Sequence, residues 1–282
     1  MQKHAYLILA HANPEFLQTL VNCLDNPAND IFIHWDAKSG GLPKISASES
    51  GLLFTSKRVS VHWGDFCVVE AEYALFREAR HNGHYQYYHL ISGADLPVKT
   101  QEEIHRLCSL APGIEYIGFA TPAEGEIEWR VCHYFLFPHK FQSQDIFIKA
   151  VRKAANTIQD ILRIRRQNGE FKKGSQWASV TEDFVDYLLS REEYVRKTFN
   201  RTFCPDELYK QTLCWNSGFR NRLPETKDEF EGCRRFIKWE NGCLVPIVGE
   251  DIPAMLGSDR WFARKFSSDD QATINQVLSS IC

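Results

Sequence analysis

Apolar residues in the first 120 positions form short continuous runs that alternate with stretches at helical spacing. The runs predict buried strands at His4–Ala10, Ile31–Trp35, Tyr85–Ile91 and Ile114–Phe119. The stretches between them predict helices, with start or stop signals at their ends, over Pro14–Leu24, Phe66–Ala79 and Gln101–Leu110. This repeated order predicts an α/β fold with a mostly parallel central sheet flanked by helices.

Polar residues with useful chemistry stand where the predicted strands end. His11 follows the first strand, Asp36 follows the second, and Asp95 lies just beyond the third. Ligands of open parallel sheets bind beyond the carboxyl ends of the strands. We therefore expect these three residues to lie near one ligand site.

The second half of the chain has a weaker pattern. A long amphipathic helix is predicted over Asp145–Arg166, and its basic residues are Lys149, Arg152, Lys153, Arg163, Arg165 and Arg166. We expect a solvated basic face there, with contact to a polyanion or a membrane surface as the alternative. Further elements are expected at Ser175–Ser179 (strand), Glu182–Leu189, Pro205–Leu213 and Asp251–Leu256 (helices), and in a C-terminal helix. No repeat or linker interrupts the pattern, so we expect one domain over residues 1–282.

The composition is that of an ordinary globular protein. Hydrophobic residues make up 44% and charged residues 24% of the chain. Lys and Arg number 33 against 36 acidic residues, for a formal net charge of −3. This balance lacks the basic excess of a dedicated nucleic-acid-binding protein, so we expect no nucleic-acid partner.

The sequence also bears on the compartment. No apolar run approaches the ~18–20 residues that a membrane-spanning helix needs. The nine cysteines are scattered and form no C-x-x-C pair, which favours free thiols over a disulfide or zinc framework. We therefore expect a cytoplasmic protein, with peripheral contact at the inner face of a membrane as an open alternative.

Several motifs of common enzyme classes are absent. The chain has no G-x-G-x-x-G, no P-loop, no G-x-S-x-G and no H-E-x-x-H, which weakens dinucleotide, ATPase, hydrolase and zinc-protease interpretations. It also has no D-x-D pair of the kind that holds a divalent metal in many enzymes that use nucleotide-sugars. His81, His84 and His89 are interrupted by Gly83, so we expect structural histidines there and no metal site.

Five sequence blocks occur in a recognisable order. They are Ile33–Lys38 (IHWDAK), Trp63–Gly64, Leu90–Thr100 (LISGADLPVKT), Pro205–Glu207 (PDE) and Trp261–Phe266 (WFARKF), with weaker echoes at Gly174–Trp177 and Arg235–Trp239. In order and spacing the chain resembles the core-2/I-branching N-acetylglucosaminyltransferase and peptide O-xylosyltransferase family, glycosyltransferase family 14. The SGADLP and FARKF blocks are the most specific.

The resemblance implies a GT-A-type nucleotide-sugar transferase fold, a UDP-sugar donor, inversion at the anomeric carbon and no metal or other cofactor. It divides the chain into a nucleotide-binding half, residues 1–120, and an acceptor-binding and catalytic half, residues 121–282. Glu207 matches the family's catalytic base, and Arg264 with Lys265 matches its diphosphate clamp. The remaining donor-binding residues that we expect are Asp36 and, beside it, His11, Arg58 and Asp95.

The chemistry of these residue types supports the same assignment. Inversion by a single displacement requires the acceptor hydroxyl to lose its proton, and a carboxylate within ~3 Å typically contributes ~10²–10⁴-fold. Without a metal, fixed cations must neutralise the leaving diphosphate, and Arg264 and Lys265 offer a planar fork and a point charge. Taken without the resemblance, Glu207 is better explained as an acid favoured at a helix N-terminus. Asp95 is equally well explained as a cap of the turn before Pro97.

The resemblance says less about the acceptor. Trp239 matches an acceptor-side tryptophan of the branching enzymes, and a flat ring suits the C–H face of a sugar. Trp177, in the Gly174–Trp177 block, is a further acceptor candidate. Glu128 and Arg130 are candidates because they lie in the region in which the family binds its acceptor. Gln176 stands where the xylosyltransferases have an aspartate, a departure that concerns the sugar or acceptor rather than the reaction class.

We therefore expect a metal-independent inverting transferase that moves a sugar, GlcNAc or xylose first, to a carbohydrate or glycolipid acceptor. The missing anchor suggests a bacterial enzyme of surface polysaccharide or glycoconjugate synthesis. Two alternatives stay open. One is a sugar-binding module that has lost catalysis, and the other is a metal-dependent nucleotidyltransferase on a similar sheet.

Overall fold

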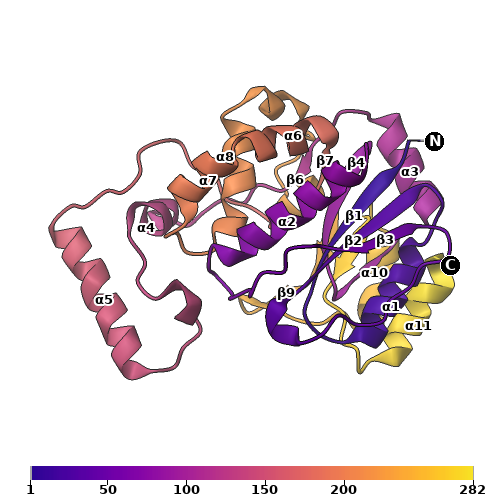
Figure 1. The fold of residues 1–282 in the computed structure, drawn as a ribbon, viewed down its shortest axis with the longest axis horizontal. Helices are drawn as coiled ribbons and strands as arrows, with labels where there is room; N and C mark the ends of the chain where they lie inside the picture. The colour runs from indigo at the N-terminus through magenta and orange to yellow at the C-terminus, as the bar shows by residue number, and fades with distance from the viewer. Residues whose placement is uncertain (1, 282) are drawn as a thin grey trace.

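A central six-stranded sheet with helices on both faces forms the body of the molecule, in a computed structural model that describes residues 2–281 (Figure 1). In the order in which they lie across the sheet, the strands are β3 (Gly51–Phe54), β2 (Asn29–Trp35), β1 (His4–Ala10), β4 (Tyr87–Ser92), β7 (Ala178–Thr181) and β6 (Tyr116–Ile117). The strands β1 to β4 are parallel, and β7 runs antiparallel to both of its neighbours. The predicted mostly parallel sheet is confirmed.

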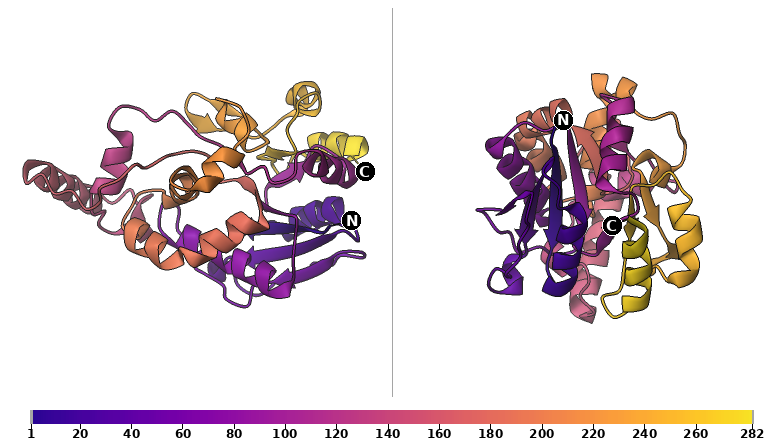
Figure 2. Two further views of the ribbon diagram at one scale, coloured as in Figure 1. Left: turned by 90° about the horizontal axis from the view of Figure 1, so that it is seen from above. Right: turned by 90° about the vertical axis from the view of Figure 1, so that its right-hand side faces the viewer.

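Alternate residues of the strands supply two hydrophobic cores, one on each face of the sheet. On β1, Tyr6 and Ile8 belong to the first core, and Ala5 and Leu7 belong to the second. The first core is covered by α1 (Pro14–Leu24), α3 (Gln101–Leu110), α10 (Ile252–Leu256) and α11 (Gln271–Ile281). The second is covered by α2 (Cys67–Asn82), α6 (Glu182–Ser190), α7 (Glu192–Phe199) and α8 (Tyr209–Trp215). Figure 2 shows the sheet between these layers.

A second, three-stranded sheet lies beside the first core. Its order is β5 (Asp95–Pro97), β11 (Phe262–Arg264) and β8 (Arg235–Ile237). The fully buried side chain of Arg235 joins the two sheets. Its guanidinium donates to the carbonyl oxygens of Leu90 (3.2 Å) and Ala178 (2.9 Å) and to Ser179 Oγ (3.1 Å). The C-terminal strands are thereby tied to the centre of the main sheet.

Residues 133–167, called the arm below, extend from the body and carry α5 (Ile146–Ile161) (Figure 1). The prediction of one helix over Asp145–Arg166 is wrong at its C-terminal end. The chain leaves the helix after Ile161 because Arg163 adopts a left-handed φ of 52°. Arg166 then turns back toward the body, where its side chain donates to the Val131 carbonyl oxygen.

Other differences from the expected elements are local. The predicted helix Pro205–Leu213 is a 3₁₀ turn over Pro205–Glu207 followed by α8, because Leu208 leaves helical geometry at φ −124°. The strand expected at Ser175–Ser179 lies at β7, and the strand expected at Ile114–Phe119 is only the short β6. The sequence did not predict β3, α7, α4 (Glu126–Cys132), α9 (Glu229–Gly232) or the hairpin of β9 (Trp239–Glu240) and β10 (Cys243–Leu244).

Two further expectations concern the whole chain. No helix between residues 2 and 281 is long and apolar enough to cross a membrane. The cysteines from Cys67 to Cys243 are free thiols, as predicted.

Candidate functional site

The loop after β2 is held in shape by Arg58. The guanidinium donates to the carbonyl oxygens of Trp35 (2.9 Å) and Asp36 (2.8 Å). The buried Asp36 carboxylate accepts from a backbone N–H two residues further on. At the neighbouring end of β1, the His11 carbonyl oxygen accepts from Ser39 Oγ. The structure therefore brings His11, Asp36 and Arg58 to one edge of the sheet, with Arg58 bound to the backbone of the loop.

Arg264 lies between a carboxylate and an indole ring. The pairing of β11 with β5 sets it opposite Asp95, and Arg264 Nε lies 3.5 Å from Asp95 Oδ1. On the other side, its guanidinium carbon lies 4.0 Å from the centre of the Trp177 ring. Burial lowers the pKa of Arg264, which Asp95 partly offsets, and burial raises the pKa of Asp95. The cation is thus held in a fixed position beneath the surface.

Lys265 follows Arg264 directly and is only half-buried. Its carbonyl oxygen accepts from Ile247 N (2.9 Å), which fixes the backbone after β11. Within residues 2–281 no acidic side chain forms an ion pair with its ammonium group. The pair predicted to bind a diphosphate therefore consists of one enclosed guanidinium and one more accessible ammonium group.

Glu207, the predicted base, ends the 3₁₀ turn, and its side chain is 36% exposed. Arg130 on α4 donates to its carboxylate at 2.8 Å. Arg130 also contacts Glu126 at 3.1 Å, and Lys173 reaches the same Glu126 oxygen at 2.8 Å. We predicted Arg130 as an acceptor ligand, whereas the structure places its guanidinium on the Glu207 carboxylate. It can hold the Glu207 carboxylate in one orientation.

A buried ion pair lies under the turn that carries Glu207. Lys210 Nζ lies 2.6 Å from Glu72 Oε2, and both side chains are fully buried. Glu72 also accepts from Tyr209 Oη (2.5 Å) and Gln176 Nε2 (2.9 Å). Sequence reasoning missed both charged residues, although one signal was available. Glu72 lies at helical spacing from Val69, on the apolar face of α2, where a charge needs a buried partner.

The neighbouring Asp206 is a second buried carboxyl group. Its Oδ1 has no hydrogen-bond partner among the described residues, while Lys210 Nζ donates to its carbonyl oxygen at 3.2 Å. Burial and the carboxylates of Glu207 and Glu72 raise the pKa of Asp206 to about 7. The adjacent acids Asp206 and Glu207 therefore differ in environment: Asp206 is enclosed and Glu207 is open to solvent.

The segment 174–178 connects the Arg264 cation with the Glu207 turn. Gly174 N donates to the Glu207 carbonyl oxygen at 2.9 Å, and Trp177 packs under Arg264. Position 174 must be glycine, because a Cβ there would come within 1.9 Å of the Gly118 carbonyl oxygen. Gln176 lies between them and binds Glu72. Arg264 of the predicted clamp and Glu207, the predicted base, thus both contact this one short segment, Arg264 through the Trp177 ring and Glu207 through Gly174 N.

The acceptor candidates divide into two groups. Trp239 is 52% exposed in the β9–β10 hairpin, and Glu128 is exposed on α4, so both are accessible to a ligand. Trp177 is buried, and its ring face is occupied by Arg264. Its predicted role as a sugar platform does not fit this position, and it supports the Arg264 cation instead.

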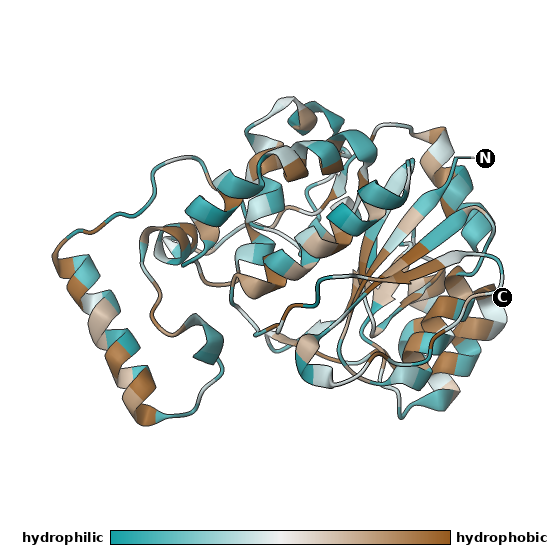
Figure 3. Cartoon of the chain, in the orientation of Figure 1, coloured by the Kyte–Doolittle hydropathy of each residue, from teal (hydrophilic) through white to brown (hydrophobic). Residues whose placement is uncertain are grey.

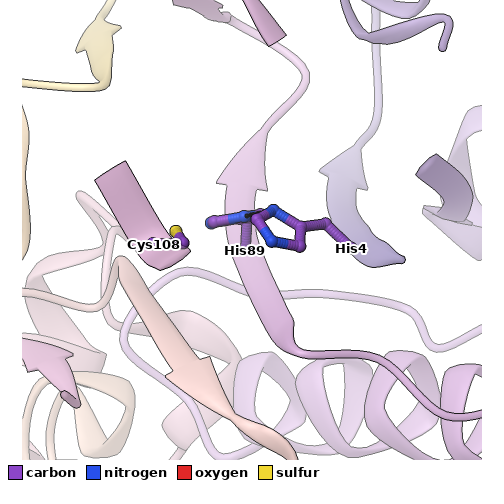
Figure 4. A group of neighbouring side chains, drawn as sticks. All are labelled: His4, His89 and Cys108. Atoms are coloured by element: carbon purple, nitrogen blue, oxygen red, sulfur yellow. Dashed lines mark hydrogen bonds between the residues drawn. The ribbon is translucent and has the colours of Figure 1, made fainter. Parts of the chain in front are cut away.

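The histidines expected to be structural lie apart from one another. His84 binds Glu182 at 2.8 Å at the surface, while His89 is fully buried in β4. Figure 4 shows His89 against His4 of the adjacent strand, with Cys108 of α3 nearby. His89 is hydrogen-bonded at both ring nitrogens, to Ser179 Oγ (2.8 Å) and His4 Nδ1 (3.0 Å). Burial lowers the pKa of His89 and brings that of His4 to about 3, so this cluster is a neutral part of the core.

Comparison with known proteins gives a family match over most of the chain. The model of the core-2/I-branching enzyme family matches residues 4–255. A xylosyltransferase of Caenorhabditis briggsae, sqv-6, is 23% identical over 86% of this chain and 32% of its own length. The human beta-1,3-galactosyl-O-glycosyl-glycoprotein beta-1,6-N-acetylglucosaminyltransferase is 22% identical over 94% of this chain and 66% of its own.

A third relative is a plant protein, the beta-glucuronosyltransferase GlcAT14B of Arabidopsis thaliana. It is 20% identical over 94% of this chain and 63% of its own length. The chain therefore spans from about a third to two thirds of the length of these relatives. Their names specify three different transferred sugars and agree on glycosyl transfer.

Proposed function

The chain belongs to the core-2/I-branching enzyme family and has the expected GT-A-type α/β fold, and we propose that it transfers a sugar from a UDP-sugar to an acceptor hydroxyl. The observation that carries this proposal is the segment 174–178. The segment contacts a predicted diphosphate cation, Arg264, near one end and the turn of a predicted base, Glu207, at the other.

In the proposed reaction, the acceptor oxygen attacks the anomeric carbon of the donor sugar in one displacement. The new carbon–oxygen bond forms as the bond to the β-phosphate oxygen breaks, and UDP leaves with that electron pair. Glu207 takes the proton of the acceptor hydroxyl, and one displacement inverts the configuration. Arg130 lies 2.8 Å from the Glu207 carboxylate, so it can hold the proposed base in one orientation.

The leaving diphosphate carries charge that the site must stabilise. Arg264 is already held by Asp95 and Trp177, so little reorganisation is needed when the charge develops. Lys265 adds a second positive charge beside it. We propose that these two residues do the work that a divalent metal does in other nucleotide-sugar enzymes, and that transfer needs no metal.

The remaining assignments follow from position. Asp36 and its Arg58-bound loop lie where a nucleoside is expected at the carboxyl end of a parallel sheet, with His11 beside them. Trp239 and Glu128 are the accessible acceptor candidates. GlcNAc and xylose are the donor sugars proposed first, and a carbohydrate or glycolipid is the proposed acceptor. A role in bacterial surface polysaccharide synthesis stays a prediction.

The decisive experiment separates donor binding from transfer. Glu207→Gln should bind UDP as the wild type does and should lower the transfer rate by ~10²–10⁴-fold. The matched control is Glu193→Gln, which changes an exposed carboxylate on α7 that has no part in the site. UDP binding is measured by thermal shift, and transfer by UDP release with UDP-GlcNAc, UDP-xylose and UDP-glucuronate. Wild-type rates in Glu207→Gln would refute the assigned base, and no response to UDP would favour a sugar-binding module.

A further inference from the structure

The helix of the arm carries an exposed apolar strip. Residues at helical spacing along α5 make up this strip, and they are Phe147, Ala150, Ala154, Ile158 and Ile161. The three large side chains are 73%, 53% and 72% exposed in that order. Figure 3 shows brown patches along α5, which projects away from the rest of the molecule. A strip of this kind marks a binding surface, because water-soluble proteins rarely leave so many large apolar side chains of one helix uncovered.

Basic residues flank the strip. Lys149 and Lys153 are exposed on one side of α5, and Arg163 and Arg165 are exposed just beyond its C-terminus. Across the whole arm, seven Lys and Arg residues oppose two acidic residues, Asp145 and Asp160. The chain as a whole has a formal charge of −3, so the excess of +5 in the arm leaves −8 for the remainder. Positive charge is therefore concentrated in the arm, which also carries the apolar strip.

The arm is fixed where it joins the body. Its two ends are tied together by His133 Nε2 to Asp160 Oδ1 (2.8 Å) and by Tyr134 N to Gln159 Oε1 (2.7 Å). Arg166 N donates to the carbonyl oxygen of Cys132, the last residue of α4. Because α4 also carries Arg130, the ion-pair partner of Glu207, the base of the arm adjoins the candidate active site.

We propose that the arm docks on an anionic lipid surface, with the apolar strip inserted among the headgroups and the flanking Lys and Arg residues on lipid phosphates. A large apolar face combined with a Lys- and Arg-rich polar face is the pattern of helices that lie in a membrane interface. A second copy of this chain is the less favoured occupant of the same face, because two such arms would bring like charges together. The inference does not depend on the proposed transfer chemistry.

Flotation with vesicles tests the proposal. The wild type should float with phosphatidylcholine vesicles that contain 30% phosphatidylserine, remain at the bottom with pure phosphatidylcholine, and release at high salt. Lys149→Gln with Lys153→Gln should weaken partitioning about fivefold for each lysine removed. Phe147→Ser with Ile158→Ser and Ile161→Ser should weaken it by more than about tenfold.

The matched control replaces two exposed lysines outside the arm, Lys44→Gln with Lys197→Gln, and should bind as the wild type does. Each protein is also checked for its circular dichroism melt and its response to UDP. Failure to float with the UDP response intact would overturn docking and leave the proposed function standing. Equally weakened binding in the lysine control would also overturn it. So would a wild type that does not float but forms a dimer in sedimentation velocity, if only the serine variant abolishes that dimer.

Discussion

The buried Lys210–Glu72 pair should be strongly coupled, and a double-mutant cycle can measure this. Lys210→Met would leave the Glu72 carboxylate fully buried without its cation, with only Tyr209 and Gln176 as donors. Glu72→Gln would leave the Lys210 ammonium buried beside the Asp206 carbonyl oxygen. Breaking one side of such a pair typically costs about 3–5 kcal/mol.

Those losses are large compared with the ~5–15 kcal/mol by which most domains are stable. The double variant should recover most of the loss and unfold within about 1–2 kcal/mol of the wild type, because the orphaned charge is gone and the introduced amide oxygen can still accept from Tyr209. The coupling energy should then be at least about 3 kcal/mol.

The free energy of unfolding is measured by urea denaturation at pH 7. Tryptophan fluorescence and far-ultraviolet circular dichroism are recorded together, and coincident transitions justify a two-state analysis. If each single variant lowered the free energy of unfolding by less than about 1 kcal/mol, the two charges would not be excluded from water. Additive losses in the double variant would show that Lys210 and Glu72 do not stabilise each other.

The remaining predictions concern pH, the diphosphate clamp and metal. The raised pKa of Asp206 means that folding favours its protonated form, so this carboxyl stabilises the fold below about pH 4 and loses that contribution as pH rises through about 7. Asp206→Asn should therefore gain stability relative to the wild type by a few kcal/mol between pH 4 and pH 8, and an unchanged difference in urea melts would contradict this. Arg264→Ala should weaken UDP binding about 10–100-fold in calorimetry. Trp177→Leu should weaken it about 2–10-fold through the lost cation–π contact, and an unchanged affinity would argue against Trp177 as a support. Transfer should survive excess EDTA, whereas complete loss that Mn²⁺ restores would favour the metal-dependent alternative.

The longer strands and the helices of the first half were predictable because their signals are local, whereas the short β3 was missed. A helix was predicted near Gln101–Leu110, and the structure has α3 over these residues, with Thr100 capping its first turn. The runs at β1 and β2 have the length and the β-branched and aromatic residues of buried strands. By contrast, β5, β8 and β11 have three residues each, too few for any periodic pattern, and they exist through pairing with one another.

Candidate site residues could be named from the sequence where they lie inside a recognisable sequence block. The blocks around Asp95 and Arg264 are 169 positions apart, yet the β5–β11 pairing sets the two side chains against each other. What the sequence could not show was which partner each charge meets. Lys210 and Glu72 are 138 residues apart, and the ring of Trp177 is covered by Arg264 from a distant strand. Such contacts are set by tertiary packing, so a tryptophan predicted as a sugar platform became the support of a cation.

The way Arg235 joins the two sheets makes the molecule unevenly tolerant of substitution. Two of its three acceptors across the sheet boundary, at Leu90 and Ala178, are main-chain carbonyl oxygens, which remain whatever side chains those strands carry. Drift in the sequence of β4 or β7 therefore leaves the junction intact as long as the backbone register holds. A single codon change at Arg235 removes every one of these bonds together, so a deep mutational scan should find no tolerated substitution at Arg235.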